Sequence, residues 1–446
     1  RGKVVTDGTP AELLAMSRYH NAVSIRIASH QLAATREMLG SIDDVDGIDL
    51  IEEAEARAAA ARQAAAEAEQ ARQQAAAAQA AANGKVLVIL ELSGGNDGLN
   101  TVVPYGDDAY YRHRPNIGLP KNELRILDDH FGLNPGMAGF ERLYKDGKMA
   151  IVHGCGYDNP SYSHFTSMAY WHTAAPNSGE AYGWVGRLAD AMAPAAPANY
   201  LVNIAARQSL AVRSARHVPV VFDAPNRFMR ESFYEEKEAL AMVADIGEVE
   251  NPSRRYLLDI ARSANDASAL VREAWSNYSS PVDYGVNGLD LPKVVSLLDA
   301  GMPTHIYYVS YRNNAFDTHV FQNDLHRRLL TYTSDAVSAF MQDLERIGRA
   351  DDVALMIFSE FGRRVPENVS LGTDHGAANA MFVVGKTVKG GHYGELPSLT
   401  QLTEGDNLPH TTDFRRVHRT MIKEWLGHGD TAELLNGDFE SFDLFT

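Results

Sequence analysis

The stretch KVLVILELSGGNDGLN, residues 85–100, decides the fold of this chain. Its first eight residues form a nearly unbroken apolar run, which is typical of a strand buried on both faces of a parallel sheet. Three glycines and two oxygen-bearing side chains, Asn96 and Asp97, follow directly. A strand that ends in such a loop predicts an α/β domain with ligands at the strand ends. An ordinary Asp/Gly turn is the alternative interpretation.

Five further apolar runs repeat the pattern of the first strand, at residues 149–153, 218–222, 305–311, 352–358 and 381–385. Between the fourth and fifth strands, apolar residues recur at helical spacing over 324–348, which predicts a crossover helix and parallel neighbouring strands. The more charged section at about 226–300 predicts a helical insertion. We therefore expect an α/β fold with a mostly parallel central sheet and helices on both faces.

Composition limits the partners of the chain. A formal charge of -17 argues against nucleic acid and against anionic membrane surfaces, because both would repel the protein. The single cysteine, Cys155, excludes an intrachain disulfide and a cysteine-built zinc site. No apolar stretch reaches the roughly 18 to 20 residues of a membrane-spanning helix, and we find no signal-peptide pattern.

The first 83 residues differ in kind from the rest. Residues 1–48 resemble, in the stretch DGTPAEL, the C-terminal tail of the ATP-binding subunit of ABC transporters, but they carry no Walker motif. Residues 49–83 are mostly Ala, Glu, Gln and Arg, which predicts a long solvated spacer helix, with a coiled-coil partner helix as the alternative. We expect three parts, 1–48, 49–83 and 84–446, and leave open a protein partner for the N-terminal helix.

Metal-ligand residue types lie beside the later predicted strands. Asp317 and His319 follow one strand, Glu360 follows the next, and Asp374 with His375 precedes the last. Residues two apart in an extended segment point the same way, so Asp317 and His319 can reach one metal. Together with Asp97 they predict a two-metal site for zinc, calcium, magnesium or manganese. Each pair taken alone also fits an ordinary surface pair or turn.

Hydroxyl and basic side chains complete the predicted site. Ser161, Ser163 and His164 stand at a predicted helix start, where backbone N–H groups stabilise anions. Ser163 is therefore the candidate nucleophile, with Ser161, His164 and Asn96 as candidate substrate contacts. Metal binding, or simple capping and packing, is the alternative for His164. A simple N-cap serine is the alternative. Arg363 is suited to clamp a phosphate or sulfate, although a structural ion pair with Glu360 explains it equally.

Several stretches together resemble one known family: LELSGGNDGLNTVVP, NPSYSHF, FDTHVFQ, FSEFGRRVPEN and GTDHGAANAMFVVG. They resemble the bacterial domain of unknown function family 1501, in the alkaline phosphatase and sulfatase-like superfamily, over about residues 84–446. The resemblance implies that one metal is held by Asp97, Ser163 and Glu360. It implies that the other is held by Asp317, His319 and His375. Family members are often exported to the periplasm, which leaves the location of this chain open.

Two departures from the superfamily pattern affect the metals. The pair at 317 and 319 is spaced D-x-H instead of D-x-x-x-H, and Glu360-Phe361 replaces the usual Asp-His. The lost imidazole predicts that one metal site is weak, empty, or suited to calcium or magnesium. An alternative alignment makes Asp374 and His375 the Asp-His pair and gives the last position to His392 or His410.

The leading hypothesis is a metal-dependent hydrolase of phosphate or sulfate esters that acts on a small anionic substrate. The competing hypothesis is a catalytically silent protein that binds or assembles with a transporter or secretion partner. The two differ in one geometric expectation, because a hydrolase requires the predicted ligands to converge on a shared centre.

Overall fold

The computed structural model describes residues 33–34, 37, 84–228, 255 and 267–446. The predicted ABC-like segment and alanine-rich spacer therefore lie almost wholly outside the described residues. So does about half of the predicted insertion, residues 229–254 and 256–266, and the insertion stays a prediction. The strands are β1 Val86–Leu92, β2 Val102–Val103, β3 Arg125–Ile126, β4 Gly132–Leu133, β5 Met149–Gly156, β6 Leu201–Ile204, β7 Val220–Phe222, β8 Ile306–Tyr311, β9 Val353–Phe358, β10 Asn379–Gly385, β11 Gly391–Tyr393 and β12 Thr412–Asp413.

The helices are distributed along the whole described chain. The α-helices are α4 Gly98–Thr101, α5 Asp108–His113, α6 Ala138–Lys145, α7 His164–Thr173, α8 Trp184–Met192, α11 Leu291–Asp299, α12 Gln322–Arg346, α13 Arg415–Thr420 and α14 Ala432–Leu435. Short 3₁₀ turns cover Lys121–Glu123, Leu210–Val212 and Pro225–Arg227, and a π-helical turn covers Met421–Trp425. No helix among the described residues is long and apolar enough to cross a membrane.

One large sheet organises the domain. Its strands lie in the order β11-β5-β10-β9-β1-β8-β6-β7, and β12 pairs with β5. Strand β1 is central and runs parallel to both β8 and β9. Strand β10 alone runs against its neighbours, since it pairs antiparallel with β9 and β5. A small second sheet holds β2, β4 and β3.

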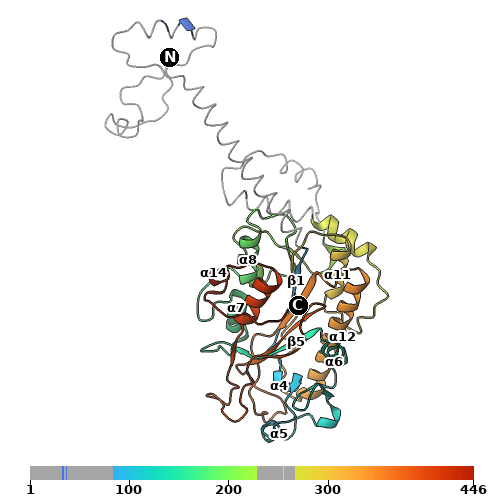
Figure 1. Ribbon diagram of the computed structural model, residues 1–446, viewed down its shortest axis with the longest axis vertical. Helices are drawn as coiled ribbons and strands as arrows, with labels where there is room; N and C mark the ends of the chain where they lie inside the picture. Colours follow the sequence, from blue (N-terminus) through green and yellow to red (C-terminus); the bar gives the residue numbers. More distant parts are fainter. Residues whose placement is uncertain (1–32, 35–36, 38–83, 229–254, 256–266) are drawn as a thin grey trace, which may run out of the picture. The chain divides into compact units, whose positions relative to one another are not determined.

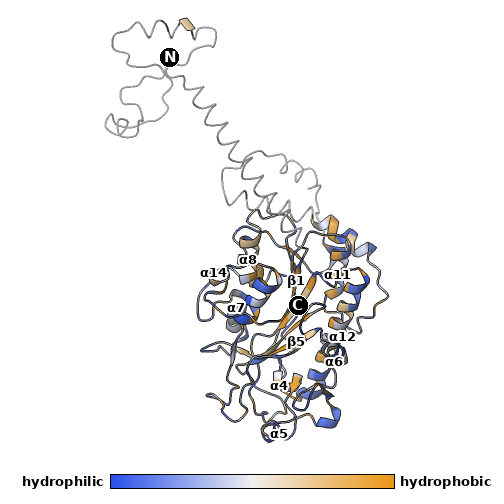
Figure 2. Cartoon of the chain, viewed as in Figure 1, coloured by the Kyte–Doolittle hydropathy of each residue, from blue (hydrophilic) through white to orange (hydrophobic). Residues whose placement is uncertain are grey.

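Both faces of the sheet are covered, and β1 shows why its sequence is apolar throughout. Val88 and Leu90 enter one core, while Leu87 and Ile89 enter the other. Helices α6, α11 and α12 contribute to the first core, and α7, α8, α13 and α14 to the second (Figure 1). Figure 2 shows the central strands as the most hydrophobic part of the domain. Alternate side chains of one strand thus meet two different helical layers.

The predicted fold class is confirmed: the described domain is α/β, with a mostly parallel sheet between two helical layers. All six predicted strands are present, and the crossover helix predicted at 324–348 is α12. The connection from β8 through α12 to β9 joins parallel strands, with β1 lying between them. Strand β6 was not predicted, because LVNI is short and interrupted by Asn203.

Candidate metal centre

Asp317 lies after β8 and is surrounded by three imidazoles. Its Oδ1 lies 2.8 Å from His319 Nε2 and 3.1 Å from His375 Nε2. Its Oδ2 lies 3.3 Å from His164 Nε2, at the start of α7. Ligand atoms of His164, Asp317 and His375 all lie within 4.8 Å of one another. We name His164, Asp317, His319 and His375 the Asp-His cluster.

The other nitrogen of each histidine in the Asp-His cluster faces an oxygen. Nδ1 of His164 lies 2.8 Å from Glu360 Oε1, and Nδ1 of His375 lies 2.7 Å from the backbone oxygen of Tyr162. Nδ1 of His319 lies 3.5 Å from Asp374 Oδ1. An Nδ1–H that faces an oxygen acceptor leaves the Nε2 lone pair free, which is how metal-binding histidines are oriented.

The donor set of the Asp-His cluster fits a divalent metal. His164 Nε2 is buried and makes no hydrogen bond among the described residues, although it faces Asp317 Oδ2 at 3.3 Å. Nε2 atoms of His319 and His375 are only 3.0 Å apart. Two lone pairs that face each other this closely are favourable only with a proton or a cation between them. Imidazole nitrogens with one carboxylate are ligands that suit zinc and other first-row metals.

Arg363 fixes Asp317 and is itself fully engaged. Its guanidinium is buried and donates to the backbone oxygens of Gly94, Gly95, Phe316 and Thr373 as well as to Asp317 Oδ1 at 2.8 Å. Burial would raise the pKa of Asp317, but the hydrogen bond and charge of Arg363 outweigh burial and lower that pKa to about 2. Asp317 is therefore ionised at neutral pH. The geometry assigns Arg363 to holding the carboxylate, because its donors are engaged by Asp317 and by four backbone oxygens, and its Nη1 also lies 3.4 Å from His319 Nε2.

Glu360 supports a histidine instead of facing a metal. It is fully buried, and its carboxylate accepts hydrogen bonds from the backbone N–H groups of Gly94 and Gly95 at 2.9 to 3.1 Å. Ser359 Oγ and His164 take its remaining contacts. Both glycines have positive φ, 118° and 70°, so successive N–H groups point to one anion. The glycine-rich loop thus cradles a carboxylate of the protein itself.

Asp97 is directed into a separate buried ion pair. Its Oδ2 lies 2.7 Å from Arg114 and 2.6 Å from Gln322 Nε2, and its Oδ1 caps α4 through the N–H groups of Leu99 and Asn100. Burial would raise the pKa of Asp97, but the charge of Arg114 and the other contacts lower it. The structure does not bring Asp97 into the Asp-His cluster.

The remaining predicted residues differ in accessibility. Asn96 is buried, where Thr101 and His326 Nε2 contact its side chain, so it lies inside the fold. Ser161 Oγ accepts from the N–H of Ser163 at 3.3 Å. Ser163 precedes α7, its side chain is exposed, and it makes no side-chain cap hydrogen bond.

The histidines of the alternative alignment have other partners. His392 Nδ1 lies 2.7 Å from His153 Nε2, and its Nε2 lies 3.2 Å from Asp128. His410 faces only Asp158, at 3.6 Å. Both contacts differ from those of His375, whose Nε2 points at Asp317. The geometry therefore favours the assignment of the last ligand position to His375.

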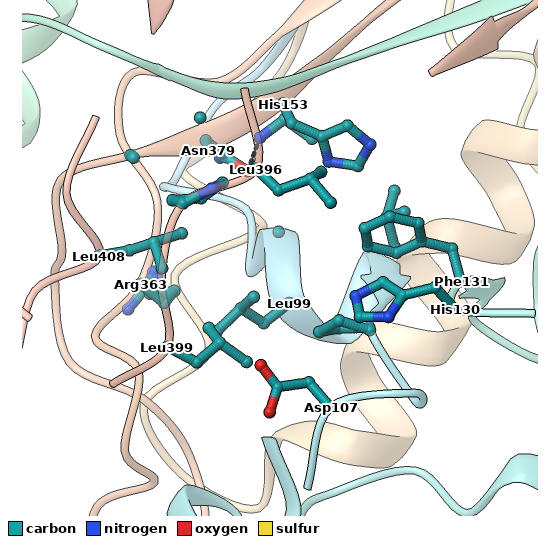
Figure 3. Close-up of a pocket in the computed structure, with 17 residues that line it drawn as sticks. Leu99, Asp107, His130, Phe131, His153, Arg363, Asn379, Leu396, Leu399 and Leu408 are labelled. Atoms are coloured by element: carbon teal, nitrogen blue, oxygen red, sulfur yellow. Dashed lines mark hydrogen bonds between the residues drawn. The ribbon is translucent and has the colours of Figure 1, made fainter. Parts of the chain in front are cut away.

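Two cavities adjoin these residues. One, of about 60 Å³, is walled by leucines and bears Asp107, His130 and His153, with Arg363 and Asn379 at its side (Figure 3). The other, of about 260 Å³, is lined at one end by His164 and Glu360 and also by Glu91 and His172. Neither Glu91 nor His172 was singled out from the sequence. The available signal was a charged residue inside the otherwise apolar run of β1.

Comparisons with known proteins find distant structural likenesses. They include a protein in the alkaline phosphatase superfamily from Vibrio parahaemolyticus, with 11% identity, 79% of this chain and 68% of that chain covered, and a TM-score of 0.38. They also include the PsFucS1 sulfatase from Pseudoalteromonas sp., with 10% identity, 83% and 74% covered, and a TM-score of 0.35. The C-terminal periplasmic domain of EcEptC from Escherichia coli, in complex with Zn, gives 10% identity, 77% and 82% covered, and a TM-score of 0.31.

Sequence comparison gives the family. No curated protein matches the chain. A family model described as protein of unknown function DUF1501 matches residues 84–426, which is most of the chain and the whole of the large sheet. This match confirms the resemblance found in the strand-end motifs. The chain belongs to the DUF1501 family.

Proposed function

We propose that this protein is a metal-dependent hydrolase of phosphate or sulfate esters, with its metal held by His164, Asp317, His319 and His375. One observation carries the proposal: three imidazole Nε2 atoms converge on one carboxylate, while each Nδ1 faces an oxygen. His164 Nε2 supports the proposal further, because this buried atom faces Asp317 Oδ2 at 3.3 Å without making a hydrogen bond. A bound metal would give this site a local positive charge. An anionic substrate needs that charge, because the protein as a whole is strongly acidic.

The proposal has one metal instead of two. Asp97 contacts Arg114 and Gln322, and Glu360 accepts from two backbone N–H groups. Oxygens that are engaged in this way are poor ligands, because metal binding would break the existing contacts. A bound divalent metal would act as a Lewis acid on the ester oxygens and would lower the pKa of a nearby hydroxyl.

Ser163 is the proposed nucleophile. It directly precedes His164, and its exposed side chain lies at the N-terminus of the ten-residue helix α7. The free N–H groups of the first turn favour an anion beside that hydroxyl. Ser163 Oγ would bond to the phosphorus or sulfur as the bond to the ester oxygen breaks, and that oxygen would leave as the alcohol with the proton lost by the serine. Water would then displace Ser163 Oγ and release phosphate or sulfate.

The test combines metal analysis with a substrate panel. The purified chain is expected to hold about one equivalent of metal and to hydrolyse aryl phosphates or sulfates. His375→Ala is expected to weaken metal binding by at least about 100-fold and to abolish hydrolysis, since it removes a ligand. His410→Ala is the matched control, because His410 faces only Asp158. A folded protein without metal and without hydrolysis across the panel would instead support a silent binding or assembly protein.

A further inference from the structure

The cavity of about 260 Å³ extends from the Asp-His cluster along α7. His164 lines it at the first turn of α7, and His172 lines it eight residues later. Eight residues at 1.5 Å per residue separate the two by about 12 Å along the helix axis. The cavity therefore leads from the candidate metal centre to a second polar group. We name this space the α7 cavity.

The polar group at the far end of the α7 cavity is a buried carboxylate. Glu91 is 6% exposed and lies in β1, whose other side chains are all apolar and buried. Its Oε2 lies 2.7 Å from His172 Nε2 and accepts a hydrogen bond of 2.5 Å from Tyr308. No residue that the structure describes donates a hydrogen bond to Oε1. Oε1 is open to the cavity, so a ligand can donate a hydrogen bond to it in place of water.

The walls of the α7 cavity are partly apolar. Phe165, Met168, Ala169 and Leu210 supply the apolar surface, and Ser93 and Asn314, which hydrogen-bond to each other, add polar surface. Phe165 lies at the mouth with 89% of its side chain exposed, although it is a large aromatic residue. An aromatic side chain left in water beside a candidate catalytic centre suits contact with an apolar part of a ligand.

We infer that the α7 cavity binds the organic part of the ester. This part has an apolar body, which packs against Phe165, Met168 and Leu210, and a hydrogen-bond donor at its far end, which reaches Glu91 Oε1. The donor is an ammonium or a hydroxyl group, since both can donate a hydrogen bond to a carboxylate oxygen that has no protein donor. The inference rests on the proposed function for the position of the ester group. It adds the substrate class: monoesters of amphipathic alcohols about as long as two helical turns.

Three benzyl esters that differ only in the group at the 4-position test this inference. They carry a 4-methyl, a 4-hydroxymethyl or a 4-aminomethyl group, and each is prepared as the phosphate and as the sulfate. The metal-loaded full chain is expected to show a kcat/KM about tenfold higher or more for a donor-bearing ester than for the methyl ester. Preference for the amine alone identifies an ammonium, and equal preference for both identifies a neutral donor.

Two variants connect the preference to the α7 cavity. Glu91→Gln is expected to reduce the ratio of amine to methyl rates to within about twofold of unity, because the amide lacks the charge. Ala169→Phe is expected to raise KM for all three esters, since it fills the cavity. Glu433→Gln is the matched control at an exposed position of α14 and is expected to retain the wild-type ratio.

A non-hydrolysable series separates this inference from the proposed function. The three corresponding benzyl phosphonates are titrated into the metal-loaded chain by calorimetry. Selective binding of a donor-bearing phosphonate, weakened about tenfold by Glu91→Gln, would support the α7 cavity even if no ester is hydrolysed. Hydrolysis without any preference among the three esters would overturn the inference and leave the proposed function standing. Equal or undetectable binding of all three phosphonates, without hydrolysis, would overturn both.

Discussion

At the scale of single residues, the buried pair of Asp97 and Arg114 shows how a metal-ligand residue type can serve the fold. The carboxylate at the end of β1 has the position and chemistry of a ligand, and only its partners decide its use. Arg114 lies 17 residues after Asp97 and Gln322 lies 225 residues after it, so no local sequence pattern predicts either contact. Removing one partner of a buried ion pair leaves the other charge uncompensated.

Asp97→Asn therefore distinguishes the two uses. We expect it to lower the free energy of unfolding by about 3 to 5 kcal/mol. The metal content of the protein that remains folded should equal that of the wild type, because the Asp-His cluster is unchanged. Urea unfolding measures the first quantity and elemental analysis the second. If Asp97→Asn were as stable as the wild type but bound no metal, the result would show that Asp97 is a metal ligand.

Glu360 tests the same distinction in the opposite direction. Glu360→Gln keeps the shape of the side chain but replaces the charge that faces His164 Nδ1. We expect metal affinity to fall by about 10- to 100-fold, the usual effect of losing a carboxylate behind a histidine ligand. Titration of metal against a chelator measures the change. An affinity equal to that of the wild type would show that Glu360 does not orient His164.

At the scale of elements, the glycine-rich loop after β1 couples the fold to the candidate centre. A Cβ on Gly95 would lie 2.2 Å from a ring carbon of Phe361. Phe361 is buried, and its ring lies 4.9 Å from that of His164 and 4.8 Å from that of His375. Any displacement of Phe361 is therefore passed on to two of the candidate ligands.

Gly147 provides the matched control, because it has the same φ of 70° as Gly95 and a Cβ added to it would meet nothing within 4 Å. Gly147→Ala should cost only the backbone strain of about 1 to 2 kcal/mol. Gly95→Ala should cost more than about 3 kcal/mol, since overpacking adds to the same strain, and should weaken metal binding about tenfold. Thermal unfolding and metal titration of both variants check this. If the two variants had the same thermal stability and metal affinity, Phe361 would be able to move aside without disturbing the candidate ligands.

The same elements show what the sequence could and could not predict. Unbroken apolar runs identify buried strands, because a strand covered on both faces needs apolar side chains at every position. Their direction is not encoded in this pattern, so the reversed β10 was not predicted. The spacing of Asp317 and His319 predicts that they act together, and the structure brings them together with His375. His164 was predicted to contact substrate. Its position beside Asp317 could not be predicted, because it depends on the tertiary packing of α7.

At the scale of the whole molecule, buried histidines make stability depend on pH. Burial lowers the pKa of His153 and of His418 to about 3. In the unfolded chain each has a pKa near 6.5, so below that pH the unfolded state binds protons that the native state excludes. The free energy of unfolding is therefore highest above about pH 6.5 and decreases as the pH falls towards the native pKa.

We expect the two histidines together to lower the free energy of unfolding by about 3 kcal/mol between pH 6.5 and pH 5. The ring nitrogens of His418 make no hydrogen bonds, and its ring stacks on that of Trp184 with the centroids 4.3 Å apart. Phenylalanine can therefore replace the imidazole in shape. His418→Phe should remove about half of this pH dependence. Urea unfolding of wild type and variant at several pH values measures the slopes. A variant with the wild-type slope would exclude His418 as a source.

The reversed direction of β10 has a consequence for how the chain folds. Because β10 runs against β9, the residues before it lie at the same sheet edge as the residues after β1, β8 and β9, and His375 reaches Asp317 there. The ligand set accordingly spans the chain from His164 to His375, and closing so long a loop has an entropic cost that only the assembled sheet offsets. During synthesis the centre cannot form until β10 has been made and inserted between β9 and β5. Metal uptake would then report completed folding, and a nascent chain that stops short of β10 would bind the ion weakly.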